Sequence, residues 1–89
     1  MHNGFWKDGD RLVLLAEQIK RTRQKAFLSQ EAFANILGIS VSTINRWENG
    51  KCKPSLSAMK EIKTFCVDRN LSYDELEEAW FDFDEKSEE

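Results

Sequence analysis

The sequence is poor in the residues that build several classes of functional site. Its 89 residues include one histidine, two cysteines, one proline and four glycines. Nucleophilic catalysis usually needs a base beside a serine or cysteine, and the one histidine, His2, lies near the start of the chain. A zinc site needs about four ligands at suitable spacing, which His2, Cys52 and Cys66 do not provide. We therefore expect no enzyme activity, no metal and no cofactor.

Two further absences concern the membrane and disulfide bonds. The longest apolar run, Leu12–Ala16, is far shorter than the roughly 20 residues of a membrane-spanning helix. Two cysteines separated by thirteen residues are too few for a disulfide scaffold, and they are typical of free thiols in a reducing compartment. We therefore expect a cytoplasmic protein that makes no contact with a membrane.

Charge is unevenly distributed along the chain. The whole sequence carries 13 Lys and Arg against 16 Asp and Glu, a net charge of −3. Residues 1–70 hold twelve basic and seven acidic residues (+5), whereas residues 71–89 hold one basic and nine acidic residues (−8). Because the larger part is basic, the acidic total does not exclude binding to nucleic acid.

Two short helical patterns separated by Gly38 lie in the middle of the chain. Ser29 is suited to cap a first helix over residues 30–37, and Gly38 can end it in the left-handed conformation. Ser40 is suited to cap a second helix over residues 41–48. Apolar residues spaced by about one helical turn, together with the apolar residue between the two helices, are expected to point inward. They are Phe33, Ala34, Leu37, Ile39, Ile44 and Trp47.

The other face of the second helix carries short polar groups, a valine and an arginine. Arginine pairs with guanine and asparagine with adenine in the DNA major groove, where a methyl-bearing side chain is also accommodated. The candidates for contact with base edges are Val41, Ser42, Asn45 and Arg46. For Ser42 and the neighbouring Thr43 an alternative stays open, because their hydroxyls could serve only the helix N-terminus.

An ordered set of short motifs links these two helices to a known family. The motifs are Ser29-Gln30, Phe33-Ala34, Gly38-Ile39-Ser40, Ser42-Thr43-Ile44, Trp47-Glu48-Asn49-Gly50 and Lys53-Pro54-Ser55. From about Ile19 to Cys66 the chain thereby resembles the helix-turn-helix domain of phage repressors, Cro proteins and Xre-like regulators. The resemblance implies an all-α fold, a compact bundle of about five helices like that of lambda repressor, and binding to double-stranded DNA.

The resemblance also implies contacts to the DNA backbone. Gln30 matches the family's glutamine at the start of helix 2, which holds a phosphate. We expect further phosphate contacts from Thr43, Asn49, Lys51 and Lys53.

A charged pair matches another feature of the family. Arg23 and Glu48 correspond to an ion pair that acts as a structural clamp on the recognition helix; the alternative is two solvated charges. The sequence departs from the family at two places, with Thr22 where a hydrophobic residue is common and Phe27 where glycine is common.

The remaining segments complete the predicted organisation. We expect an irregular arm over residues 1–9, the DNA-binding domain over 10–70, and an acidic helix and tail over 71–89 that pack on or extend the same domain. Asp10 is suited to cap the first helix, which runs to about Lys25. The residues expected to be buried in this helix are Leu12, Leu15, Ala16 and Ile19.

Two more helices follow the recognition helix. Ser55 can cap a fourth helix to about Asp68, and Ser72 can cap a fifth to about Phe83. The fourth helix is expected to bury Leu56, Met59, Ile62, Phe65 and Cys66, and the fifth to bury Tyr73, Leu76 and part of Trp80.

These expectations favour a transcriptional regulator, a repressor, that inserts the helix over residues 41–48 into the major groove. Phe81 and Phe83 lie among acidic residues and form a candidate surface for a symmetric homodimer. The alternative function is an antitoxin-like or other protein-interaction module, in which the acidic C-terminal helix binds a protein partner.

Overall fold

The computed structural model describes residues 8–87, and the side chains of residues 13–82 within that range. This part of the chain folds into helices without strands, which confirms the predicted all-α bundle. The helices are α1 (Asp8–Lys25), α2 (Gln30–Leu37), α3 (Val41–Glu48), α4 (Leu56–Asp68) and α5 (Asp74–Ser87). The arm expected over residues 1–9 lies mostly outside the described residues, and residues 8 and 9 already belong to α1.

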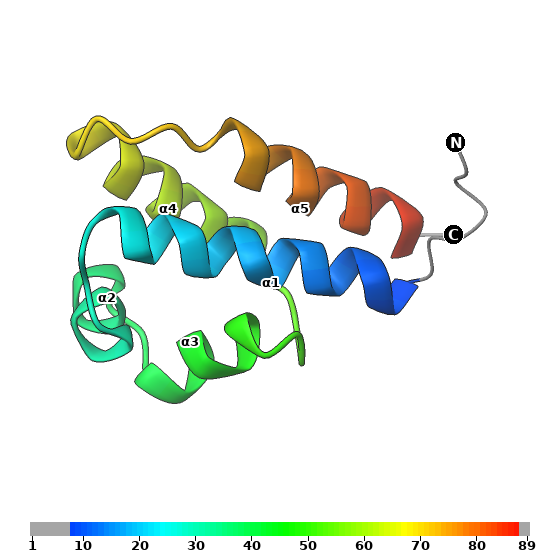
Figure 1. Ribbon diagram of the computed structural model, residues 1–89, viewed down its shortest axis with the longest axis horizontal. Coiled ribbons are helices and arrows are strands. Elements are labelled where there is room, and N and C mark those ends of the chain that lie inside the picture. Colours follow the sequence, from blue (N-terminus) through cyan, green and yellow to red (C-terminus); the bar gives the residue numbers. More distant parts are fainter. Residues whose placement is uncertain (1–7, 88–89) are drawn as a thin grey trace.

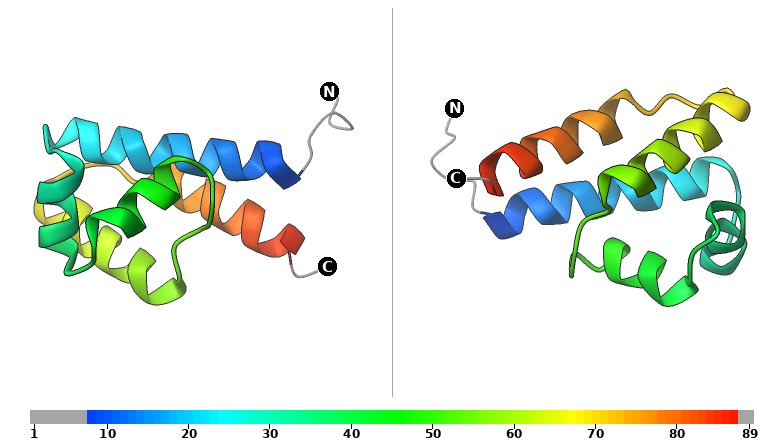
Figure 2. Two further views of the ribbon diagram at one scale, coloured as in Figure 1. Left: turned by 90° about the horizontal axis from the view of Figure 1, so that it is seen from below. Right: turned by 180° about the vertical axis from the view of Figure 1, so that it is seen from behind.

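The longest helices lie at the centre and at one edge of the molecule. α1 and α5 pack along each other and run in opposite directions (Figure 1). The right-hand view of Figure 2, seen from behind, shows the same order of helices as Figure 1, with α1 between α5 and α3. α3 therefore lies at one edge of the bundle, where its outer face is open.

The ends of α2 and α3 follow from their capping residues. The Ser29 hydroxyl accepts a hydrogen bond from the Ala32 N–H (3.0 Å), and Ser40 accepts one from Thr43 (3.2 Å). Gly38 has a φ of 73°, which an L-side chain rarely adopts, and so ends α2 with little strain. The predicted bounds of both helices are confirmed.

Three of the other predicted helix boundaries are wrong. α1 begins at Asp8, so Asp10 lies within its first turn and is not its capping residue. α5 begins at Asp74, because the Tyr73 carbonyl accepts its first helical hydrogen bond, from Glu77 N–H at 2.9 Å. It ends at Ser87, beyond the expected end at Phe83.

A single hydrophobic core joins all five helices. The Phe33 and Phe65 rings meet in an edge-to-face arrangement, with 5.1 Å between the centroids. α5 contributes Leu76 and Trp80, which are 1% and 6% exposed. The core consists of Leu15, Ile19, Phe33, Ala34, Leu37, Ile44, Trp47, Met59, Ile62, Phe65, Cys66, Leu76 and Trp80.

Leu56 does not belong to this core, contrary to the sequence prediction. It is 62% exposed at the first position of α4. Leu56 shares the inward spacing of Met59, but it lies at the open end of the groove between α4 and α5 and is covered by neither helix. Ile39 and Tyr73 are half-buried, and the Leu12 side chain lies outside the described part.

The two departures from the family pattern have different structural outcomes. Thr22 is 4% exposed, and its hydroxyl donates to the Gln18 carbonyl at 2.8 Å, so this polar residue occupies a buried position with its polar group satisfied. Phe27 has a φ of 59° and is 94% exposed. A bulky residue in the left-handed region is strained, which explains why glycine suits this position.

Candidate nucleic-acid interface

The outer face of α3 carries the residues predicted to contact bases. Ile44 and Trp47, on its inner face, are 0% and 4% exposed and fix the orientation of the helix on the core. Val41, the first residue of the helix, is 42% exposed at the edge of the outer face. The other exposed residues of this face are Ser42, Asn45, Arg46 and Asn49. The structure therefore brings all four predicted base-contact residues onto one open surface.

Hydroxyl groups cluster at the N-terminus of α3. The Ser40 oxygen lies 3.2 Å from the Ser42 oxygen and 2.9 Å from the Thr43 oxygen. Ser42 is exposed and Thr43 is half-buried. Both hydroxyls thus have a local role at the helix N-terminus, and their contacts with DNA stay predictions.

Arg46 is the cation of the exposed face. It lies in the last turn of α3, where a positive charge interacts favourably with the helix dipole. Its side chain makes no hydrogen bond or ion pair with any other residue of the described part. Five N–H donors therefore remain for a base edge or a phosphate.

The predicted clamp is a bidentate ion pair. Arg23 donates from Nε to Glu48 Oε2 at 2.8 Å and from Nη2 to Oε1 at 2.9 Å. The two side chains are 13% and 3% exposed, which excludes the alternative of two solvated charges. The hydrogen bond that Arg23 donates to Glu48 raises the pKa of Arg23 above its ordinary value, against the smaller opposing effect of burial. Arg23 also donates to the Leu28 carbonyl at 2.8 Å, so it ties α1 both to α3 and to the connection before α2.

Gln30 extends this ion pair onto the exposed face of α3. Its Nε2 donates to Glu48 Oε1 at 3.0 Å, and its Oε1 accepts from Asn45 Nδ2 at 3.4 Å. Asn45 Oδ1 in turn accepts from Asn49 Nδ2 at 2.9 Å. The residue predicted to bind a phosphate therefore lies directly beside one predicted to contact a base.

The loop after α3 carries the two lysines of the predicted phosphate contacts. Lys51 is exposed, and Lys53 is half-buried with its Nζ 5.0 Å from the centroid of the Trp80 ring. The Trp80 indole N–H donates to the Pro54 carbonyl at 2.8 Å. The Trp80 hydrogen bond and the cation–π contact thus both connect α5 to this loop.

The described residues contain no cluster that could hold a metal ion. Three or more histidine, cysteine, aspartate or glutamate side chains do not come together there in a way that could hold a metal. Burial raises the pKa of the Cys66 thiol, with a smaller opposing effect from Lys25, so the reactive thiolate form is disfavoured. Within residues 8–87, every helix is too short or too polar to cross a bilayer.

Comparison with known proteins finds similarity over the segment that contains α2 and α3. A family model described as helix-turn-helix matches residues 19–66, which extend from within α1 to within α4. The chain is also 37% identical over 54 residues to the Type II methyltransferase M.SsoII of Shigella sonnei. This alignment covers 57% of the chain but only 14% of the length of that relative. A search of solved structures gave no match.

Two features of this surface do not follow from the sequence motifs. One is the connection from Glu48 through Gln30 to Asn45, because hydrogen bonds between side chains on different helices depend on the packing. The other is the contact of Lys53 and Pro54 with Trp80, which lies 26 residues after Pro54. The only sequence signal for the second feature was the expectation that Trp80 is partly buried.

Proposed function

The chain belongs to the helix-turn-helix family, and from this membership we propose that it is a sequence-specific DNA-binding protein that represses transcription. In this proposal α3 enters the major groove, and its outer face contacts base edges through Val41, Ser42, Asn45 and Arg46. The proposal includes no catalytic activity. It places the protein in the cytoplasm, together with the DNA that it binds.

The observation that carries the proposal is the rigid support of an open polar helix face. Trp47 is buried on the inner side of α3, and the next residue, Glu48, is fixed by Arg23 through two hydrogen bonds. Because both the helix and its end are fixed, the backbone that carries the exposed Asn45 and Arg46 has a defined position before DNA binds. Such preorganisation lowers the entropy lost on binding.

The phosphate contacts surround this face. Gln30 stands at the N-terminus of α2, where exposed backbone N–H groups also attract anions. Lys51 and Lys53 follow α3 in the chain, and Thr43 and Asn49 lie at its two ends. Contacts of this kind set the position of the protein on the duplex, whereas the base contacts determine the sequence.

Replacement of Arg46 by alanine tests the proposed base contact. We expect binding to the preferred duplex to weaken by about 1–3 kcal/mol, with a relaxed preference at one base pair. Lys51→Ala is the matched control, because loss of a phosphate contact weakens binding to all duplexes alike and lowers the salt slope by about one. Fluorescence anisotropy on the preferred duplex and on single-base variants measures both. An equal loss on every duplex for Arg46→Ala would make Arg46 a phosphate contact.

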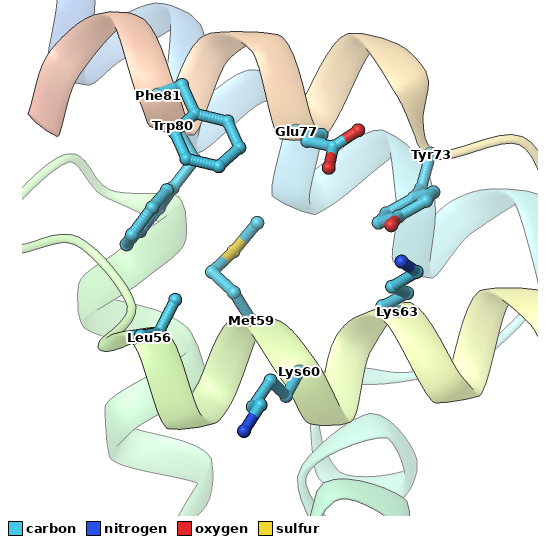
Figure 3. A pocket seen from close by; sticks show the side chains of 8 residues that line it. All are labelled: Leu56, Met59, Lys60, Lys63, Tyr73, Glu77, Trp80 and Phe81. Atoms are coloured by element: carbon cyan, nitrogen blue, oxygen red, sulfur yellow. The ribbon is translucent and has the colours of Figure 1, made fainter. Parts of the chain in front are cut away.

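A groove between α4 and α5 supports the proposal of a homodimer. Figure 3 shows Met59 pointing from α4 toward α5, with Trp80 and Phe81 at one end of the groove and Tyr73 at the other. Leu56 and Phe81 are 62% and 49% exposed there. Phe83, the second phenylalanine of the predicted surface, lies outside the described side chains.

Charge around the groove is arranged so that it can complement itself. Lys60 and Lys63 lie on the α4 side. The α5 side is acidic and carries Asp74, Glu77, Glu78 and Asp82. In a two-fold symmetric contact, the basic side of one copy faces the acidic side of the other, with the apolar residues between them. Such a dimer can place two recognition helices about 34 Å apart on successive turns of DNA.

Sedimentation velocity tests the dimer directly. The chain is expected to sediment as a dimer at tens of micromolar, and Phe81→Ser is expected to sediment as a monomer because it removes an exposed apolar ring from the contact. Phe81 is exposed, so circular dichroism should show the same helix content for both proteins. A monomeric wild-type chain would contradict the dimer and favour the alternative, a basic protein partner on the acidic face of α5.

A further inference from the structure

The three amides that connect the ion pair to the surface of α3 have a defined direction. We refer to Gln30, Asn45 and Asn49 as the amide row. It begins at Glu48, and each amide nitrogen in it donates toward the preceding residue, at 3.0, 3.4 and 2.9 Å in order. Glu48 itself is 3% exposed in its side chain and is held at both oxygens by Arg23. The amide row therefore starts from a fixed point in the protein.

The direction of the row follows from the chemistry of its first member. A carboxylate only accepts hydrogen bonds, so the Gln30 side chain must turn its NH2 group toward Glu48. Its oxygen is thereby turned toward Asn45, which must present its own NH2 group. Asn45 then directs its oxygen toward the NH2 group of Asn49. One carboxylate thus sets which end of each amide is donor and which is acceptor.

We infer that Glu48 is a positioning residue for base recognition, acting through Gln30 on Asn45. The inference rests on the proposed function, in which Asn45 contacts a base edge. After its two contacts within the row, Asn45 retains one N–H donor and one acceptor position. A bidentate contact with adenine requires one donor and one acceptor, and requires them in a defined order along the groove. Glu48 fixes that order.

The row also explains how Gln30 can face a phosphate. Its carbonyl is turned toward Asn45, and its second N–H remains as a donor, which is the group that a phosphate oxygen binds. Without an acceptor-only partner, the side-chain amide could turn over and present its oxygen to the phosphate. The backbone contact and the base contact therefore depend on the same carboxylate.

The test uses two variants that interrupt the row at different points. Glu48→Gln replaces the acceptor-only group by an amide that can donate, so Gln30 and Asn45 can both turn over. Gln30→Met removes the link and leaves Arg23 and Glu48 in place, so it does not depend on the stability of a changed ion pair. Gln24→Met is the matched control, an exposed glutamine in α1 with no contact to the row.

Binding is measured on two duplexes that differ only at the base pair where Asn45→Ala reduces the preference of the protein. Gln30→Met and Glu48→Gln are each expected to reduce the ratio of the two affinities about tenfold, within the range that one base contact is worth. A lost phosphate contact lowers both affinities equally and cancels in the ratio. Gln24→Met should keep the wild-type ratio.

A second measurement needs no DNA. The 1H–15N signals of the Asn45 side-chain amide are expected to shift in Gln30→Met and Glu48→Gln but not in Gln24→Met, while the backbone signal of the buried Ile44 shows that the fold is kept. Unmoved Asn45 amide signals, or an unchanged ratio of affinities, would overturn the inference. If the wild-type chain prefers neither duplex, the proposed function fails and the specificity role of Glu48 fails with it. The amide signals still show whether the row exists.

Discussion

Replacement of Trp80 by alanine is expected to lower the free energy of unfolding by about 3–5 kcal/mol. The Trp80 side chain is 6% exposed, so truncation leaves a large cavity between α5 and the rest of the core. It also removes the hydrogen bond to the Pro54 carbonyl, a group that is then left without its partner in a buried position. Urea denaturation followed by circular dichroism at 222 nm measures the change.

Phe81→Ala is the matched control for this variant. Phe81 is the residue after Trp80 in α5 and is also aromatic, but it is 49% exposed. Its ring meets the Trp80 ring edge-on at 5.2 Å, so we expect a loss of about 1 kcal/mol. Similar losses for the two variants would contradict the assignment of Trp80 to the core. They would mean that the helical domain is complete without α5.

Arg23→Ala is expected to destabilise the fold by about 3 kcal/mol or more. The substitution leaves the Glu48 carboxylate buried without the cation that holds both its oxygens. It also removes the group that donates a hydrogen bond to the Leu28 carbonyl, at the connection between α1 and α2. Arg21→Ala is the control, because Arg21 is an exposed arginine of the same helix and its loss should stay within about 0.5 kcal/mol.

The double variant Arg23→Ala/Glu48→Ala separates the ion pair from other effects. Since removal of both charges leaves no unpaired charge in the interior, its loss of stability should be smaller than the sum of the two single losses. Strictly additive losses in urea would show that the two side chains do not stabilise each other, despite their distance of 2.8 Å.

Short-range signals in the sequence were sufficient for most of the fold. Ser29 and Ser40 cap their helices through their own hydroxyls, and Gly38 ends α2, so these boundaries depend only on neighbouring residues. The first turn of α5 shows the limit of this approach. Ser72 is a good capping residue by type, yet the helix begins after Tyr73, where the following acidic residues face the helix dipole.

Burial was predictable only where a helix has a neighbour on the expected side. Met59 and Leu56 have the same helical spacing, but they are 7% and 62% exposed. The difference arises because no element covers Leu56, the first residue of α4, and a sequence pattern does not show where the packing ends. The exposure of Phe27 likewise depends on the surrounding structure, because the turn between α1 and α2 sets its φ of 59°.

Some features of the candidate interface could also be predicted from the sequence, whereas others required the structure. The exposed face of α3 follows from helical periodicity, and the clamp between Arg23 and Glu48 follows from the family resemblance. The amide row required the structure, because Gln30 and Asn45 are fifteen residues apart and meet only through the angle between α2 and α3. The contacts of all these residues with DNA stay predictions.

Selection of bound sequences from a random pool of DNA duplexes tests the central claim most directly. The account predicts that one motif is enriched and that the chain binds it about 10³-fold or more tightly than a scrambled duplex at physiological salt. It also predicts that affinity falls steeply as the salt concentration rises, because bound lysines and arginines release counterions from DNA. Absence of both an enriched motif and retention on duplex DNA at low salt would contradict it.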